Sequence, residues 1–156
     1  MKQLKVDAIK DGTVIDHIPA GKAMKVLNIL KLKNSDVVMV GVNLASRKFA
    51  KKDLIKIENR ELSGDEVDRI ALIAPDANIS IIRNFEVVKK SEVNIPEKLS
   101  AIIVCQNHKC ITNTEPVTTC FYVEARNPIM VRCHYCEKSF GADEIKIAGI
   151  PVLAVN

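Results

Sequence analysis

Hydrophobic positions in the first part of the chain follow two different periods. Apolar and polar residues alternate over residues 4–8 and again over residues 13–18, after the turn at Asp11-Gly12. A period of two is typical of β-strands, because successive strand side chains point to opposite faces. Residues 20–33 instead place apolar side chains at helical spacing, so that one stripe can pack on a sheet while lysines point away. The stripe consists of Ala23, Val26, Leu27 and Leu30. The pattern predicts two strands followed by a helix.

The next residues predict two strands joined by a hairpin. Residues 37–44 form a nearly continuous β-branched run, which fits a strand at the centre of a sheet or one covered on both faces. Residues 53–59 fit a second strand, and residues 45–52 would form the hairpin between the two.

A second helix is expected to begin at Ser63. Glu66 lies three residues later, which is the spacing of a capping box, where each side chain satisfies a backbone N–H at the helix start. Pro75 ends this helix, and residues 79–88 return as a strand around Asn84. Its apolar stripe consists of Val67, Ile70, Ala71 and Ala74. Because each apolar face needs a partner, we expect two helices on one face of an antiparallel or mixed sheet, which is an α+β fold.

The cysteines divide the chain into two parts. The first 104 residues contain none, whereas all five lie between Cys105 and Cys136. A polar segment with turn-forming residues, 89–101, separates the parts, and we place a domain boundary near Pro96. The prediction is an N-terminal domain of residues 1–95 and a small, mostly β domain of residues 96–156.

Composition and charge exclude several classes of protein. Hydrophobic residues make up 47% and charged residues 27% of the 156, no apolar run could span a bilayer, and no secretory signal is visible at the start. We therefore expect a folded cytoplasmic protein with no membrane partner. The net charge of +4 is spread too evenly for a typical nucleic-acid binder. One local cluster, Arg47, Lys48, Lys51 and Lys52, fits either a solvated turn or a phosphate contact.

The cysteine spacing predicts a metal site. Cys105 and Cys110 form one short-range pair, and Cys133 and Cys136 form another after 22 intervening residues. A hairpin can bring two such pairs to the corners of a tetrahedron around Zn²⁺. Four thiolates close the coordination sphere, so the metal would be structural, and it would supply folding energy to a domain that is small for a hydrophobic core.

Other arrangements of these residues are possible. The thiols could be ordinary buried cysteines, two disulfides or an iron site, although disulfides conflict with a cytosolic protein. His108 or His134 could replace one cysteine in a Cys₃His site. Cys120 lies outside both pairs and is expected to be a buried strand residue.

Motifs of known catalytic sites are absent from the sequence. It contains no GxGxxG, GxxxxGK[ST], GxSxG or HExxH pattern. Asp16 and His17 are adjacent, but neighbours on a strand point to opposite faces, so we expect no catalytic pair from adjacency alone. Two other hypotheses nevertheless stay open, namely a nucleic-acid-binding zinc ribbon and a small enzyme that uses these two residues.

Several stretches together resemble the regulatory chain of aspartate carbamoyltransferase. They are DHIP at residues 16–19, KDLIKIEN at residues 52–59, NFEVV at residues 84–88 and the cysteine quartet, in this order. The resemblance covers nearly the whole chain. It implies a chain without catalytic activity in de novo pyrimidine biosynthesis, with an N-terminal ferredoxin-like allosteric domain that binds ATP, CTP and UTP. A C-terminal zinc domain would dock on the catalytic chain, and regulatory chains would pair as dimers.

The resemblance also assigns residues to the nucleotide site. Lysines would neutralise phosphate oxygens, an aspartate would accept from a ribose hydroxyl, and backbone groups would contact the edge of the base. The implied contacts are Val6, Asp7, Ala8, Ile9, Asp16, His17, Lys52, Lys56, Ile82, Val87 and Lys90.

Three residues depart from the family pattern beside the base. Ser80 and Phe85 stand where other members carry asparagine and tyrosine, and Asp7 stands in place of a glutamate. The base preference is therefore open. So is the role of residues 141–156, which could be a frayed tail or an added strand at the catalytic interface.

Overall fold

The computed structural model describes residues 7–47 and 50–149, and the chain forms two compact units that divide between Asn94 and Ile95. In the described part, no helix is long and apolar enough to cross a membrane. The first unit contains, in order, β1 (Gly12–Pro19), α1 (Ala23–Leu30), β2 (Val38–Ala45), β3 (Lys51–Glu58), α2 (Gly64–Ile73), β4 (Asn78–Arg83) and β5 (Glu86–Glu92).

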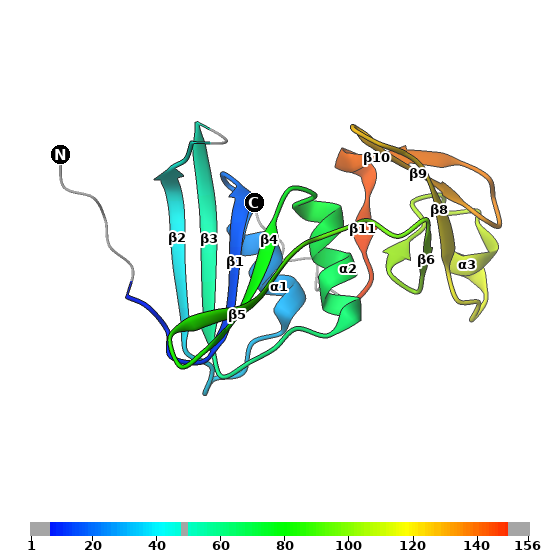
Figure 1. The fold of residues 1–156 in the computed structure, drawn as a ribbon. Helices are drawn as coiled ribbons and strands as arrows, with labels where there is room; N and C mark the ends of the chain where they lie inside the picture. Colours follow the sequence, from blue (N-terminus) through cyan, green and yellow to red (C-terminus); the bar gives the residue numbers. More distant parts are fainter. Residues whose placement is uncertain (1–6, 48–49, 150–156) are drawn as a thin grey trace. The chain divides into compact units, whose positions relative to one another are not determined.

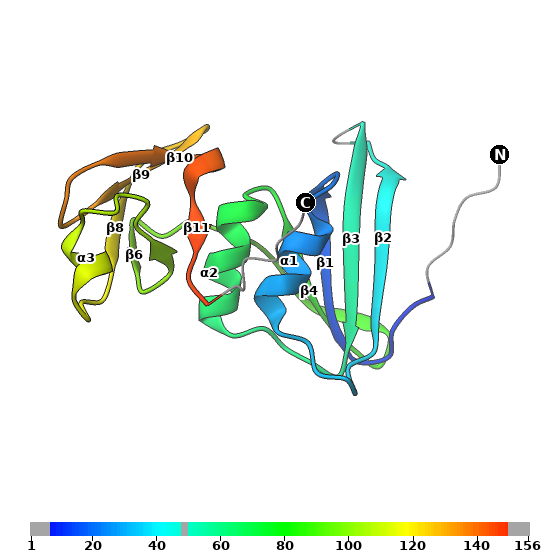
Figure 2. The same cartoon turned by 180° about the vertical axis from the view of Figure 1, so that it is seen from behind.

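The first unit is one antiparallel sheet with two helices on one face (Figures 1 and 2). The strand order is β2-β3-β1-β4-β5, and every neighbouring pair is antiparallel. The first six elements follow the βαββαβ order of ferredoxin-like folds, and β5 extends the sheet beyond β4. The predicted α+β class is confirmed.

The core of this unit lies between the sheet and the helices. Ile15 and Ile55 pair across β1 and β3, and both are fully buried. Val26 of α1 and Ile70 of α2 are equally inaccessible. Each such side chain contributes about 1.5–3 kcal/mol through burial, which makes this layer the main source of stability.

The two helices begin in different ways. Helix α2 has the expected capping box, in which Glu66 N–H donates to Ser63 Oγ and Ser63 N–H donates to the Glu66 carboxylate. Helix α1 has no side-chain cap of its own, and the Ala23 N–H donates instead to the carboxylate of Asp53 on β3. The start of α2 is therefore stabilised by residues next to it in the sequence, whereas the start of α1 depends on a tertiary contact.

Strand β2 lies at the edge of the sheet, so the expectation of a central or doubly covered strand is wrong. Val37, Val40 and Val42 are about half exposed, with Val42 at 51%. A β-branched run shows that a segment is a strand, but the order of strands depends on contacts elsewhere in the sheet. The predicted hairpin to β3 is present.

Two other predicted strands differ from the structure. The segment expected as one strand around Asn84 is a hairpin of β4 and β5, because Asn84 and Phe85 both adopt positive φ and reverse the chain. Residues 7–9 are not in a strand, and the rest of the strand expected at residues 4–8 lies outside the described residues. The polar segment expected to separate the two parts, residues 89–101, contains strand at residues 89–92 and 98–100.

The second unit consists of short strands around a small core. Phe121 is fully buried, and its ring centre lies 6.3 Å from that of Phe140. Part of the C-terminal stretch adds a strand, since β11 pairs with β7, while residues 150–156 lie outside the described residues. The elements are β6 (Lys98–Ser100), β7 (Ile103–Val104), α3 (Ile111–Thr114), β8 (Cys120–Arg126), β9 (Ile129–Cys133), β10 (Ser139–Gly141), the 3₁₀ turn η1 (Ala142–Glu144) and β11 (Lys146–Ile147).

Gly12 is the residue of the sheet least tolerant of a side chain. Its φ is 144°, and an added Cβ would lie 2.0 Å from the carbonyl oxygen of Ile57. We expect Gly12→Ala to lower the free energy of unfolding of the first unit by about 2–4 kcal/mol, measured by far-UV circular dichroism during denaturation. Gly64→Ala is the control, because a Cβ there meets nothing within 4 Å. If Gly12→Ala is as stable as Gly64→Ala, a Cβ at position 12 does not strain the sheet.

Candidate functional site

Four thiols meet in the second unit. The Sγ atoms of Cys105, Cys110, Cys133 and Cys136 all lie within 4.8 Å of one another. The Cys105–Cys136 and Cys110–Cys133 sulfur pairs are 3.6 and 3.7 Å apart. These distances are far longer than a disulfide bond, and they match the edge of about 3.8 Å expected for a tetrahedron with metal–sulfur bonds of ~2.3 Å. The cluster is therefore a metal-binding site.

Local structure holds the two cysteine pairs. Cys105 follows β7, and Cys110 is the N-cap of α3. The Asn113 amide donates to the carbonyls of Cys105 and Asn107, which fixes the first loop. In the second loop, Cys133 accepts at its carbonyl from the N–H of Glu137, a residue with φ of 63°. Each loop is a tight turn that points its two sulfurs inward.

The ionisation of the thiols favours a cation at their centre. Burial raises the pKa of Cys105 and of Cys133. Burial also raises the pKa of Cys136, but hydrogen bonds from Lys138 and Asn107 and from the neighbouring thiols outweigh it and lower that pKa to about 7. A divalent cation offsets the cost of burying the other thiolates, because metal binding deprotonates its ligands.

The alternative ligands lie elsewhere. The histidines are not part of the cluster formed within residues 7–47 and 50–149. The His134 ring packs edge-on against Tyr122 and Tyr135, with ring centres 5.7 and 5.0 Å away. His108 is exposed, and Cys120 is a half-buried residue of β8. The geometry thus supports four cysteine ligands over a Cys₃His set.

A second candidate site lies on the face of the sheet opposite the helices, which is turned toward the viewer in Figure 1. Lys56 on β3 pairs with Val14 on β1, Val14 pairs with Ser80 on β4, and Ser80 pairs with Lys90 on β5. Paired residues in a sheet share a face, so these four form a row across four strands. With strands about 4.8 Å apart, the two lysines stand ~14 Å apart at the ends of the row.

Further predicted residues lie on the same face, with Asp16 one row and Lys52 two rows from the row of Lys56. The Lys52 ammonium contacts the Asp16 carboxylate at 2.8 and 3.1 Å. His17 lies beside this pair, and its Nδ1 is 2.9 Å from the side-chain nitrogen of Asn78. Burial raises the pKa of Asp16, but the hydrogen bond and charge of Lys52 and the His17 N–H together hold it below its usual range.

A β-bulge places Asp16 and His17 together, which corrects the expectation from strand alternation. The pairing of β1 with β3 shifts between Ile15 and Ile18, and His17 has a φ of 59°. The Asp16 carboxylate accepts from the His17 N–H at 2.6 Å and lies 3.8 Å from His17 Nδ1. Alternation fails here because the bulge inserts an extra residue.

The remaining predicted residues lie along the same region. Lys56 Nζ donates to the carbonyl of Asp7 at 3.2 Å, which brings the segment that holds Ala8 and the buried Ile9 next to the sheet. Ile82 pairs with both Gly12 and Val87 one row beyond Ser80. Val6 lies outside the described residues.

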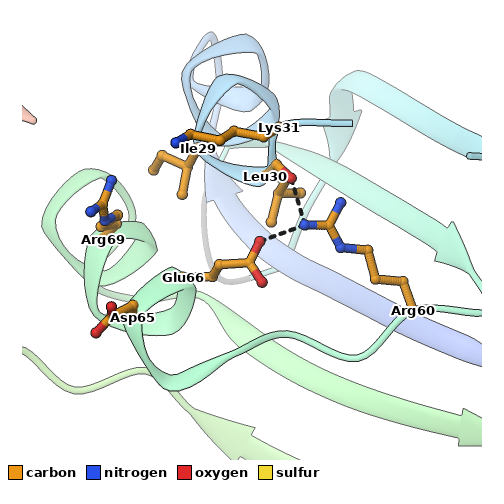
Figure 3. A pocket seen from close by; sticks show the side chains of 7 residues that line it. All are labelled: Ile29, Leu30, Lys31, Arg60, Asp65, Glu66 and Arg69. Carbon is orange, nitrogen blue, oxygen red and sulfur yellow. Dashed lines mark hydrogen bonds and ion pairs between the residues drawn. The ribbon is translucent and has the colours of Figure 1, made fainter. Parts of the chain in front are cut away.

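A pocket of about 270 Å³ lies away from these residues, between the end of α1 and the start of α2 (Figure 3). Arg60 spans it, since its guanidinium donates to the Leu30 carbonyl at 2.5 Å and to Glu66 at 2.7 Å. Asp36 lies 3.7 Å from the same guanidinium. The pocket is thus part of the helix–helix contact, and it shares no residue with the predicted nucleotide site.

Comparison with known proteins identifies the family. The family described as "Aspartate carbamoyltransferase regulatory chain, allosteric domain" matches residues 4–94, and its "metal binding domain" matches residues 97–146. The aspartate carbamoyltransferase regulatory chains of Pyrococcus horikoshii and Pyrococcus abyssi are 53% and 52% identical over 148 residues. The chain of Thermoplasma volcanium is 50% identical over 148 residues. The alignments cover 92–93% of this chain and 97% of each relative.

This chain belongs to the family of aspartate carbamoyltransferase regulatory chains. The resemblance seen in the sequence is confirmed, and the chain is a non-catalytic subunit with an allosteric and a metal-binding domain. The hypotheses of a small enzyme and of a nucleic-acid-binding zinc ribbon are therefore set aside.

Sequence reasoning missed two residues of this region. Asn78 contacts His17, and alternation with Ser80 and Ile82 along β4 could have placed it on the same face. Asp53 is fully buried beside Lys52, and the only signal was its place two residues before Ile55, on the apolar face of the strand.

The metal site predicts how each cysteine responds to substitution. Cys110→Ser should abolish stoichiometric metal binding, because three thiolates leave the site open, whereas Cys120→Ser should keep one ion per chain. Metal content of the purified chain measures this directly. The stability of the second unit can be followed in the same variants. Both tyrosines of the chain, Tyr122 and Tyr135, belong to this unit, so tyrosine fluorescence during denaturation reports its unfolding and not that of the first unit. Equal metal content in both variants would contradict the four-thiolate site.

Proposed function

We propose that the first unit of this regulatory chain binds ATP, CTP and UTP on the helix-free face of its sheet, in a cytoplasmic enzyme of pyrimidine biosynthesis. The observation that carries the proposal is the row of Lys56, Val14, Ser80 and Lys90. Two cations stand at its ends with small side chains between them. Such a row offers charge for phosphate at one end and space for a sugar in the middle.

The charge distribution supports an anionic ligand for this unit. The first 94 residues contain 17 basic and 13 acidic residues, whereas the last 62 contain six of each. The whole net charge of +4 therefore belongs to the unit with the lysine row. A localised positive field attracts polyphosphates and raises their rate of association.

Each part of a nucleotide has a partner on this face. Lys56 and Lys90 suit phosphate oxygens, and Asp16 suits a ribose hydroxyl. Backbone groups near Ala8 and Ile9 would contact the edge of the base. Backbone contacts discriminate weakly between bases, which suits a site that holds both purine and pyrimidine nucleotides.

The second unit is proposed to hold zinc and to dock on the catalytic chain. Four thiolates in a tetrahedron suit Zn²⁺, and the closed coordination sphere leaves it a structural role. The exposed Ile111 and Tyr135 lie next to the metal loops, at 43% and 44% exposure. Apolar side chains held at the surface by a rigid metal site are suited to an interface with another subunit.

The regulatory chains are proposed to pair through β2. This edge strand has unpaired backbone groups and exposes Val40 and Val42, and Val37 just before it is exposed as well. Edge strands that expose apolar residues readily pair with another chain. A second copy joined there would continue the sheet and cover the valines.

Nucleotide binding can be tested with two lysines of the same strand. We expect Lys90→Met to weaken the affinity for ATP and CTP about tenfold, measured by isothermal titration calorimetry, because a contact to a charged group is lost. Lys89→Met is the matched control, since Lys89 pairs with Ile81 in the adjacent row and therefore faces the other side. Equal losses in both variants would indicate only a general charge effect.

Removal of the metal should abolish docking on the catalytic chain but leave effector binding by the first unit intact. We expect Cys136→Ala to release the chain from the catalytic chain in co-purification, because the second unit loses its metal. Nucleotide affinity of the first unit should stay within about twofold, since its core is independent of the metal. The complex should respond to CTP and ATP in carbamoyl aspartate formation before metal removal and not after it. Unchanged association of the metal-free chain would overturn the docking role.

A further inference from the structure

Asp53 is a buried carboxylate with three backbone partners. Its side chain is fully inaccessible, and it accepts from the N–H of Gly21 at 2.9 Å, of Ala23 at 3.0 Å and of Asn43 at 3.0 Å. Gly21 belongs to the turn after β1, Ala23 is the first residue of α1, and Asn43 lies in β2. One side chain on β3 therefore fixes three other elements.

Both strands that flank β3 bulge at this level. The register of β1 against β3 shifts between Ile15 and Ile18, and that of β2 shifts between Gly41 and Leu44. The bulges contain His17 and Asn43, with φ of 59° and 56°. A bulge leaves backbone N–H groups without ladder partners. The carboxylate of Asp53 satisfies one in β2, and that of Asp16 satisfies one in β1.

Lys52 lies directly beside these bulges. It pairs with Leu44 on β2, the first paired residue beyond that shift, and with Pro19 on β1, the second paired residue beyond the other. Because successive strand residues face opposite sides, Lys52 reaches Asp16 on the open face while Asp53 lies buried on the helix face. The position of the lysine thus depends on two irregular segments, of which Asp53 holds the one in β2.

We infer that Asp53 is a positioning residue of the proposed nucleotide site, which acts by holding the β2 bulge and the start of α1 so that Lys52 and Asp16 meet the ligand. The inference rests on the proposed nucleotide binding. Asp53 itself touches no ligand, since it is buried on the helix side of the sheet. Its effect passes through the backbone of β3 and its two neighbours.

Asn is the informative replacement for Asp53. It keeps the shape of the side chain, but its amide has one oxygen, and its NH₂ group must face at least one of the three backbone N–H groups. The protein can relieve that clash only by moving the β2 bulge, the β1–α1 turn or the side chain. A shift of the β2 bulge would displace its neighbour Lys52 relative to Asp16.

A double-mutant cycle on the full-length chain tests the inference. The variants are Asp53→Asn, Lys52→Met and both together, with affinity for ATP and CTP measured by isothermal titration calorimetry. We expect Asp53→Asn to weaken binding about five- to tenfold and to add little in the Lys52→Met background, because neighbours in one network are not additive. Asp76→Asn, an exposed acid outside the site, should bind as the parent does.

The outcomes separate the inference from the proposed function. A parent chain that binds neither nucleotide overturns both. A folded Asp53→Asn variant that binds normally, or losses that simply add in the double variant, overturns the positioning role alone. A merely structural role would lower the melting temperature without changing the affinity of the folded chain.

A second measurement needs no substitution at Asp53. Coupling between sites is reciprocal, so nucleotide added to the parent chain should shift the amide resonances of Ala23 and Asn43, which donate to Asp53. The Gly64 amide, at the start of α2 and away from the proposed site, is the internal reference. Unshifted Ala23 and Asn43 amides at saturating nucleotide would also overturn the inference.

Discussion

The two-residue period of the central strands is the constraint on which the first unit depends. On β3, Ile55 and Ile57 are fully buried toward the helices, while Lys56 between them faces the opposite side. The same alternation on β1 and β4 turns apolar side chains inward and leaves Val14 and Ser80 in one row. Burial of one face therefore fixes the register of the other. The charges on the open face are positioned by hydrophobic packing that they do not take part in.

The second unit replaces hydrophobic packing with metal ligation. Its largest fully buried side chain is Phe121, and its strands are two to seven residues long. Sixty-two residues bury a smaller share of their surface on folding than a larger domain does, and metal ligation supplies part of the folding free energy. Cys133 takes part in both metal ligation and the sheet, because its thiol belongs to the metal cluster and its backbone pairs with Phe121.

Local signals in the sequence predicted local structure well. The Ser63–Glu66 capping box, the apolar helix stripes and the short cysteine pairs each depend on residues close in the chain. The structure contains the capping box, the cysteine pairs and most of both stripes, although Leu27 and Val67 are only half-buried. Features that depend on distant residues were not predictable. The edge position of β2 depends on which strands pair, and the cap of α1 is Asp53, 30 residues away.

The same difference between local and distant signals holds for the candidate nucleotide site. Periodicity alone could place Lys56 and Ser80 on one face, but the contact of Asp16 with His17 needs the bulge in β1, which no spacing rule signals. The resemblance to a family named these residues without explaining why adjacent strand residues could act together. The bulge gives that explanation, because it rotates one of the two side chains out of strict alternation.

The allosteric and metal-binding units have separate cores, and the backbone between them is held within each unit up to the boundary. Val93 is buried, and its N–H donates to the Ala77 carbonyl of the first unit, while the Ile95 carbonyl accepts from Arg126 of the second. Only Asn94 lies between these two anchors, and it is exposed. The backbone is thus anchored to its own unit on either side of Asn94.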